Sequence, residues 1–140
     1  MSVTATDFLT SAGVAYAAGS EIDLRNCVSR AYYSVFHHAL PVAEAHFADQ
    51  NANFGMGEHE RLSKRFHDGK TRKSVGVGYV LEVMKRQRRR ADYDLLDAVT
   101  VHDAQQALAQ ARGFPAQLAQ CIPQSVAPPA NAQVSTATKK

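Results

Sequence analysis

The chain has 140 residues, with 16 Lys and Arg against 13 Asp and Glu, and this length predicts one domain that buries a core without disulfide or metal staples. The N-terminus lacks a basic segment followed by an apolar run, and no stretch approaches the roughly 18 apolar residues of a membrane span. We therefore expect a cytoplasmic protein with no membrane partner.

The cysteines and histidines do not have the spacing of a metal site. Cys27 and Cys121 lie far apart in apolar contexts and no CxxC pair occurs, which predicts buried thiols. The histidines at positions 37, 38 and 46 lack the i, i+4 spacing of ligands on one helix face. No glycine-rich loop follows a strand, as nucleotide-binding loops of that type require. We expect no metal and no cofactor.

The positive charge is concentrated in one third of the chain. Residues 1–60 carry two arginines against seven acids, whereas residues 61–90 carry eleven Lys or Arg against two acids. Such a block is often simply solvated surface. A concentrated positive field also attracts polyanions, and that binding weakens steeply with salt.

Helical periodicity continues along the chain, and no segment has the alternating pattern of a strand. The first helix is expected over residues 4–18, ended by Gly19. Ser20 opens a second, longer helix with acidic residues in its first turn. The apolar spacing continues past Pro41, which is expected to kink this helix.

The second half of the chain predicts two shorter loops and further helices. A loop is expected over residues 49–57, a short helix over 58–66, and a basic loop over 67–74. A fourth helix should run from Ser74 to about Arg90, although its two early glycines weaken its start. His59 and His67, which flank the short helix, are expected at the surface.

The last helix begins with a capping-box-like pair, Thr100 and Asp103, and continues to about Gln120 with a bend near Pro115. Residues 122–140 are rich in Pro, Ala, Ser and Thr and predict a disordered tail. The sequence therefore predicts an all-α, up-and-down bundle of four to five helices over residues 1–121.

One face of the long second helix carries residues suited to phosphodiester chemistry. At about 100° per residue, Arg30 and His37 lie within about 20° of each other, and Asn26, Tyr33 and Ser34 fall on the same side. Arginine binds phosphate oxygens through a planar fork, and histidine exchanges a proton near neutral pH. The alternative is that this polar face is only solvated.

Two segments carry a resemblance to a known family. The stretches SRAYYSVFHHA, residues 29–39, and RRRADYDLL, residues 88–96, resemble the recurring stretches of small prokaryotic members of the HEPN superfamily (higher eukaryotes and prokaryotes nucleotide-binding domains). The hallmark of that family is an arginine, a spacer of four to six residues and a histidine, and six residues separate Arg30 from His37. The resemblance covers about residues 4–120.

The resemblance implies a metal-independent endoribonuclease of a toxin–antitoxin or phage-defence type system. His37 would act as general acid or base, and Arg30 would stabilise charge on the phosphoryl group. Asn26, Tyr33 and Ser34 would orient the phosphate or the imidazole. Besides RNA, the implied partners are a second copy of the chain and a nucleotidyltransferase-type antitoxin or another defence-system subunit.

Helix geometry gives a separate reason to expect a homodimer. The backbones of Arg30 and His37 stand about 10.5 Å apart along the helix, too far to converge easily on one phosphate. If two copies of the helix cross antiparallel about an axis near Tyr33 and Ser34, Arg30 of one chain lies opposite His37 of the other.

One departure from the family keeps an alternative open. Catalytic members often have a polar residue directly after the arginine, and this chain has Ala31. The alternative is a non-catalytic HEPN binding module for RNA, a nucleotide or a protein partner. A purely structural subunit would leave the basic block unexplained.

The expected RNA-binding residues in that block are Lys85, Arg86, Arg88, Arg89 and Arg90. The other interpretation of this helix end is that its charges are solvated and favoured by the helix dipole.

Overall fold

The computed structural model describes residues 2–52 and 55–123, and this part of the chain forms five helices without a strand. The all-α bundle of four to five helices is confirmed. The tail expected over residues 122–140 lies outside the described residues from position 124 onward. In the described ranges, no helix combines the length and apolar character needed to cross a membrane. The helices are α1 (Ala5–Ala18), α2 (Glu21–His46), α3 (Glu58–His67), α4 (Arg72–Tyr93) and α5 (Val101–Cys121).

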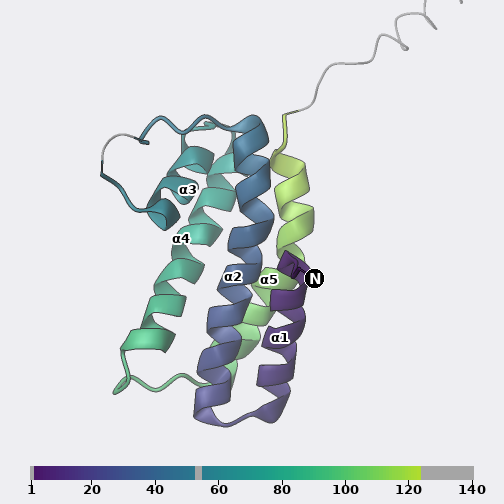
Figure 1. The fold of residues 1–140 in the computed structure, drawn as a ribbon, viewed down its shortest axis with the longest axis vertical. Helices are drawn as coiled ribbons and strands as arrows, with labels where there is room; N and C mark the ends of the chain where they lie inside the picture. Colours follow the sequence, from purple (N-terminus) through teal and green to yellow (C-terminus); the bar gives the residue numbers. More distant parts are fainter. Residues whose placement is uncertain (1, 53–54, 124–140) are drawn as a thin grey trace, which may run out of the picture.

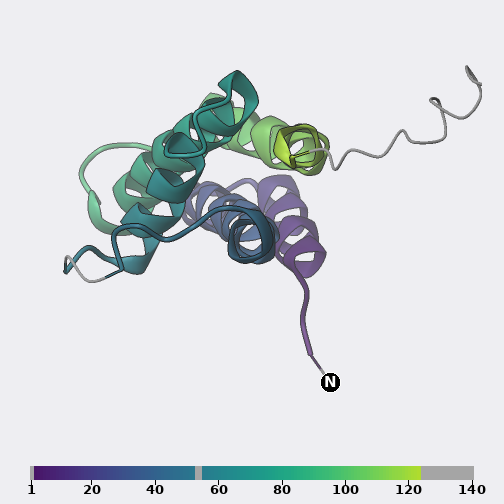
Figure 2. The same cartoon turned by 90° about the horizontal axis from the view of Figure 1, so that it is seen from above.

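The long α2 is the central helix of the bundle and runs antiparallel to α1 and α4 (Figure 1). Seen from its end, the bundle has α1 and α2 on one side and α4 and α5 on the other (Figure 2). The apolar core lies between these two pairs of helices. It includes the fully buried rings of Tyr32 and Phe114 and the side chain of Met84, and it encloses both cysteines as free thiols, as predicted.

The sequence signals for the start of α2 are confirmed. The hydroxyl of Ser20 accepts the backbone N–H of Asp23, and the Asp23 carboxylate accepts the backbone N–H of Ser20, which completes a capping box. The helix continues through the exposed Pro41 to His46. Because proline has no N–H, the backbone carbonyl of His37 loses its usual helical partner four residues on.

The two early glycines do not interrupt α4, and Gly78 allows α3 to pack closely against the helix. A Cβ atom at Gly78 would lie 2.9 Å from the His67 ring and from a backbone carbonyl of α3. The helix begins at Arg72, earlier than predicted, since the hydroxyl of Thr71 caps it by accepting the N–H of Ser74.

A buried arginine fixes the connection between α4 and α5. Arg25 of α2 is 5% exposed and donates to the backbone carbonyls of Ala91, Asp94 and Asp97 at 2.8, 3.2 and 2.7 Å. It also pairs with Glu21 at 3.1 Å. The sequence offers no signal for this role, because the accepting carbonyls come from 66 to 72 positions further along the chain.

Candidate functional site

The exposed side of α2 carries the predicted polar stripe, with one correction. Asn26, Arg30 and His37 are exposed, and Tyr33 between them is half-buried. Ser34 is fully buried and its hydroxyl has no hydrogen-bond partner among the residues that the structure describes, so its predicted place on the polar face is wrong. At about 40° from Arg30 it lies at the edge of the stripe, where packing against other helices decides exposure.

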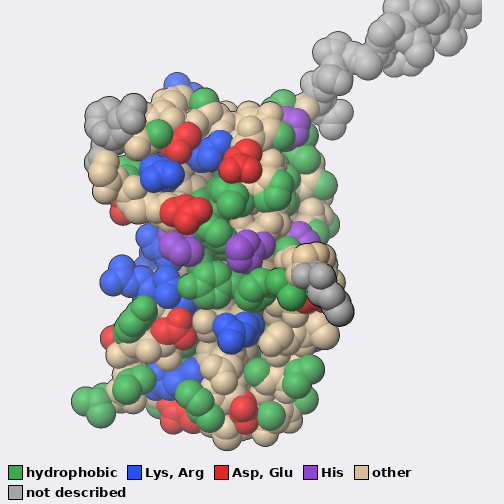
Figure 3. Space-filling view, in the orientation of Figure 1, with side chains coloured by type: hydrophobic (Ala, Val, Ile, Leu, Met, Phe, Trp, Pro, Cys, Tyr) green, Lys and Arg blue, Asp and Glu red, His purple; other side chains and the backbone are tan. Residues whose placement is uncertain are grey.

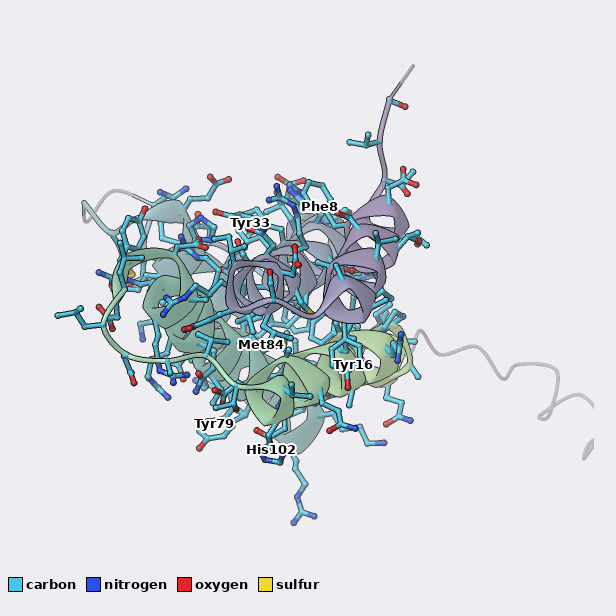
Figure 4. The ribbon with its side chains drawn as sticks, turned by 90° about the horizontal axis from the view of Figure 1, so that it is seen from below. Phe8, Tyr16, Tyr33, Tyr79, Met84 and His102 are labelled. Carbon is cyan, nitrogen blue, oxygen red and sulfur yellow. The ribbon has the colours of Figure 1, made fainter. Side chains whose placement is uncertain are left out.

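The imidazole of His37 is exposed but held among aromatic rings. It stacks on Phe8 of α1 with ring centroids 5.1 Å apart and lies 5.2 Å from the Phe36 ring and 6.3 Å from the Tyr33 ring. Phe8 and Tyr33 lie on the same side of the bundle (Figure 4). Neighbouring side chains therefore limit the orientations of this imidazole while leaving it accessible.

Arg30 is exposed one helical turn before Tyr33. Within the described ranges, no hydrogen bond or ion pair joins Arg30 to His37. Both side chains are on the same exposed stripe, one at each end of a stretch of about two helical turns. One chain therefore presents the two predicted catalytic groups on one face without bringing them together.

A second histidine, which sequence reasoning expected to be an ordinary surface residue, belongs to the same cluster. His59 of α3 is half-buried, and its Nδ1 lies 2.6 Å from the hydroxyl oxygen of Tyr32. Its ring centroid is 4.6 Å from that of Phe36, the ring that also contacts His37. Two imidazoles from different helices thus share one aromatic support.

The environment of this pair shifts two ionisation equilibria. Burial raises the pKa of Tyr32 well above its usual value, so its hydroxyl keeps its proton. Burial also lowers the pKa of His59, and the nearby cations Arg88 and Lys85 lower it further, whereas Glu58 acts in the opposite direction. His59 is therefore neutral near pH 7.

The five basic residues predicted to bind RNA fall into two groups. Arg90 is held by Asp97 at 2.6 Å and Asp103 at 3.4 Å. The side chain of Arg88 is only 11% exposed and pairs with Asp92 at 3.6 Å. Its guanidinium lies 5.6 to 5.7 Å from the ring centres of Tyr33 and Tyr32 and supports them. The second group points to solvent or lines a surface hollow and consists of Lys85, Arg86 and Arg89.

The start of α3 and the end of α4 enclose a shallow groove of about 430 Å³. His59 lines it together with Lys85, Arg88 and Arg89 from α4, while Glu58 and Glu60 contribute acidic groups. On this face of the molecule, histidine side chains gather at mid-height, with Lys and Arg on the α4 side and a hydrophobic patch below them (Figure 3). We name the hollow lined by His59, Lys85, Arg88 and Arg89 the α3/α4 groove.

The residues 2–52 and 55–123 contain no cluster of three or more His, Cys, Asp or Glu side chains able to hold a metal ion. Comparison with models of known protein families, with curated proteins and with solved structures found no significant match for this chain.

Proposed function

We propose that the protein is a metal-independent endoribonuclease of HEPN type, acting in a toxin–antitoxin or phage-defence system. The observation that carries the proposal is the exposed imidazole of His37, held by Phe8 and Tyr33 on the same helical stripe as Arg30. The Arg/His spacing and the two sequence stretches that resemble HEPN proteins support it, and so does the basic groove beside the stripe.

The reaction is an internal transesterification of RNA. His37 takes the proton of the ribose 2′-hydroxyl as that oxygen attacks phosphorus, while Arg30 stabilises the charge on the phosphoryl oxygens. The bond from phosphorus to the 5′-oxygen breaks, and the leaving oxygen receives a proton from an imidazolium or from water. The products are a 2′,3′-cyclic phosphate and a 5′-hydroxyl. DNA, which lacks the attacking hydroxyl, is not cleaved.

The working unit in this proposal is a two-fold homodimer whose α2 helices cross near Tyr33 and Ser34. An antiparallel crossing there sets Arg30 of one protomer opposite His37 of the other and forms two equivalent pairs. Since Ser34 is buried and Tyr33 is half-buried, the middle of the stripe projects less than its ends. Two copies can therefore approach along it while Arg30 and His37 stay accessible.

The first test is cleavage of single-stranded RNA in EDTA by the wild type and by His37→Ala. Loss of the general acid or base lowers the rate by about 10²-fold or more and leaves RNA affinity nearly unchanged, because the group acts mainly in the transition state. His46→Ala is the matched control, since His46 is exposed on the same helix but lies outside the aromatic cluster. Normal cleavage by His37→Ala would remove His37 from the mechanism.

The same assay separates the catalytic proposal from the non-catalytic binding module. Ala31 is completely buried, so the position that is often polar in catalytic HEPN proteins supplies no group here, and this favours the alternative. Tight RNA binding by the wild type without cyclic-phosphate product would establish the binding module.

A mixing experiment tests the shared site. Arg30→Ala and His37→Ala chains co-expressed as a heterodimer place both lesions in one Arg/His pair and leave the other pair intact. Activity should return in the heterodimer when each mutant homodimer is inactive. A wild-type protein that is monomeric at micromolar concentration yet fully active would contradict the dimer.

A further inference from the structure

We infer that the α3/α4 groove is a phosphate-binding subsite in which His59, oriented by Tyr32, donates a hydrogen bond as a neutral imidazole while Lys85 and Arg89 supply the positive charge. The identification of the ligand as RNA rests on the proposed function. The phosphate bound here belongs to a nucleotide next to the one that reacts at His37.

The contact with Tyr32 determines which nitrogen of His59 carries the proton. The Tyr32 hydroxyl keeps its proton, is buried, and has Nδ1 of His59 at 2.6 Å as its hydrogen-bond partner within the described ranges. The hydroxyl therefore donates and Nδ1 accepts, because a buried donor left unpaired is costly. The proton of the neutral ring then resides on Nε2, on the far side of the ring from Tyr32, which makes no hydrogen bond within residues 2–52 and 55–123 and can donate to a ligand.

The charged groups around His59 favour an uncharged donor. Arg88 and Lys85 on α4 and His37 on α2 disfavour protonation of His59. Glu58 on α3 favours protonation, but its effect is smaller than that of burial and smaller than that of Arg88. Arg88 pairs with Asp92 at 3.6 Å and lies beside two tyrosine rings, although its Nε has no hydrogen-bond partner among the described residues. Lys85 and Arg89 make no ion pair within those residues, and together with Arg88 they outweigh the charge of Glu58 and Glu60 in the groove. The subsite combines long-range attraction with a fixed, short-range donor.

The position of His59 relative to His37 would allow one strand to contact both imidazoles. The two imidazoles pack against the same Phe36 ring, with centroid distances of 5.2 and 4.6 Å, and against the same Tyr33 ring at 6.3 and 6.1 Å. An RNA strand whose scissile phosphate is at His37 therefore extends along these rings toward the groove. Phe36 is only 5% exposed and supports the two imidazoles from below, whereas the half-buried Tyr33 offers a ring on which a base of a single strand can stack.

The test uses a fluorescent 2′-O-methyl oligouridylate octamer, which binds as RNA does but offers no attacking hydroxyl. Its affinity is measured by anisotropy over a range of salt concentrations. His59→Ala should weaken binding on the order of tenfold and leave the slope of log K against log salt unchanged, because a neutral donor displaces no counterion. Lys85→Gln and Arg89→Gln should each flatten the slope by about 0.7. His59→Gln, which retains a neutral N–H donor, should recover part of the affinity.

Nitrogen NMR of the histidine rings gives a readout that a purely structural role would not change. His59 in the wild type should show the Nε2–H tautomer near pH 7. Tyr32→Phe, which keeps the buried ring and removes the donor, should yield a mixture of tautomers and an affinity between those of the wild type and His59→Ala.

Unchanged affinity in His59→Ala, a slope that flattens as it does in Lys85→Gln, or an Nδ1–H tautomer in the wild type would each overturn the inference. Because the octamer is not cleaved, these results do not depend on catalysis by His37. Binding that depends on His59 in a protein that cleaves no RNA would keep the subsite and reject the endoribonuclease. Cleavage of RNA by a protein whose RNA binding does not depend on His59 would keep the endoribonuclease and reject the subsite.

Discussion

The basic residues at the end of α4 can be divided by experiment into those that bind RNA and those that hold the fold. Sequence alone suggests neutralising Arg88, Arg89 and Arg90 together, but Arg88 and Arg90 are engaged by carboxylates of the same chain. That variant would mix loss of binding with loss of structure. The informative comparison is the triple variant Lys85→Gln, Arg86→Gln and Arg89→Gln against the single variant Arg90→Gln.

The expected magnitude follows from the exposure and partners of each side chain. Arg86 and Arg89 are exposed, and Lys85 lines the groove, so each can neutralise one phosphate. At about 0.7 units of salt slope per contact with a single strand, the triple variant should flatten the slope by about 2 units. Arg90→Gln should leave the slope unchanged and lower the thermal unfolding midpoint, because it removes the contacts with Asp97 and Asp103.

The assay is anisotropy with the uncleavable octamer, paired with thermal unfolding of each variant at one salt concentration. An Arg90→Gln slope that falls as far as that of Arg89→Gln would refute the reasoning, since it would mean that Arg90 binds phosphate despite its ion pairs. An unchanged slope in the triple variant would show that these three charges serve only solubility.

Four further predictions concern stability. Arg25→Met should lower the free energy of unfolding by about 3 kcal/mol, because it leaves backbone carbonyls in the last turn of α4 and in the following loop without a donor, and urea denaturation measures this. Gly78→Ala should cost about 1 to 3 kcal/mol by forcing α3 away from α4, whereas Gly113→Ala, where a Cβ meets nothing, should stabilise the protein by about 0.5 to 1 kcal/mol. Stability should fall as the pH drops below about 4. The backbone N–H of Val99 and the side chain of Arg25 lower the pKa of Glu21 below 4.5, and the backbone N–H of Thr100 lowers the pKa of Asp103 below 3.8. Both carboxylates therefore stabilise the fold above their unfolded pKa values and cease to do so as acid protonates them. Thermal midpoints measured between pH 3 and 6 check this, and a midpoint independent of pH would contradict it.

The helices and most of their ends, though not the start of α4, could be predicted from the sequence because the physics that sets them is local. Ser20 and Asp23 are three positions apart and form their capping box within one turn, and Thr100 and Asp103 repeat the arrangement. The apolar spacing of α2 likewise fixes which side faces the core, so Tyr32 is buried as expected while Arg30 stays exposed. Periodicity and caps act over a few residues, and a linear pattern reveals them.

Tertiary packing alone decided which polar residues gather at the candidate site and which are used within the fold. His59 reaches Tyr32 from 27 positions away, and nothing near His59 in the sequence marks that contact. Arg89 and Arg90 are neighbours in one basic run, yet Arg90 meets carboxylates at the start of α5 and in the loop before it, while Arg89 faces the groove. Ser34 differs from the rest of its stripe because it lies at the margin, where adjacent helices exclude water. A side chain's partners depend on which distant segments the fold brings beside it, and composition and spacing do not encode that placement.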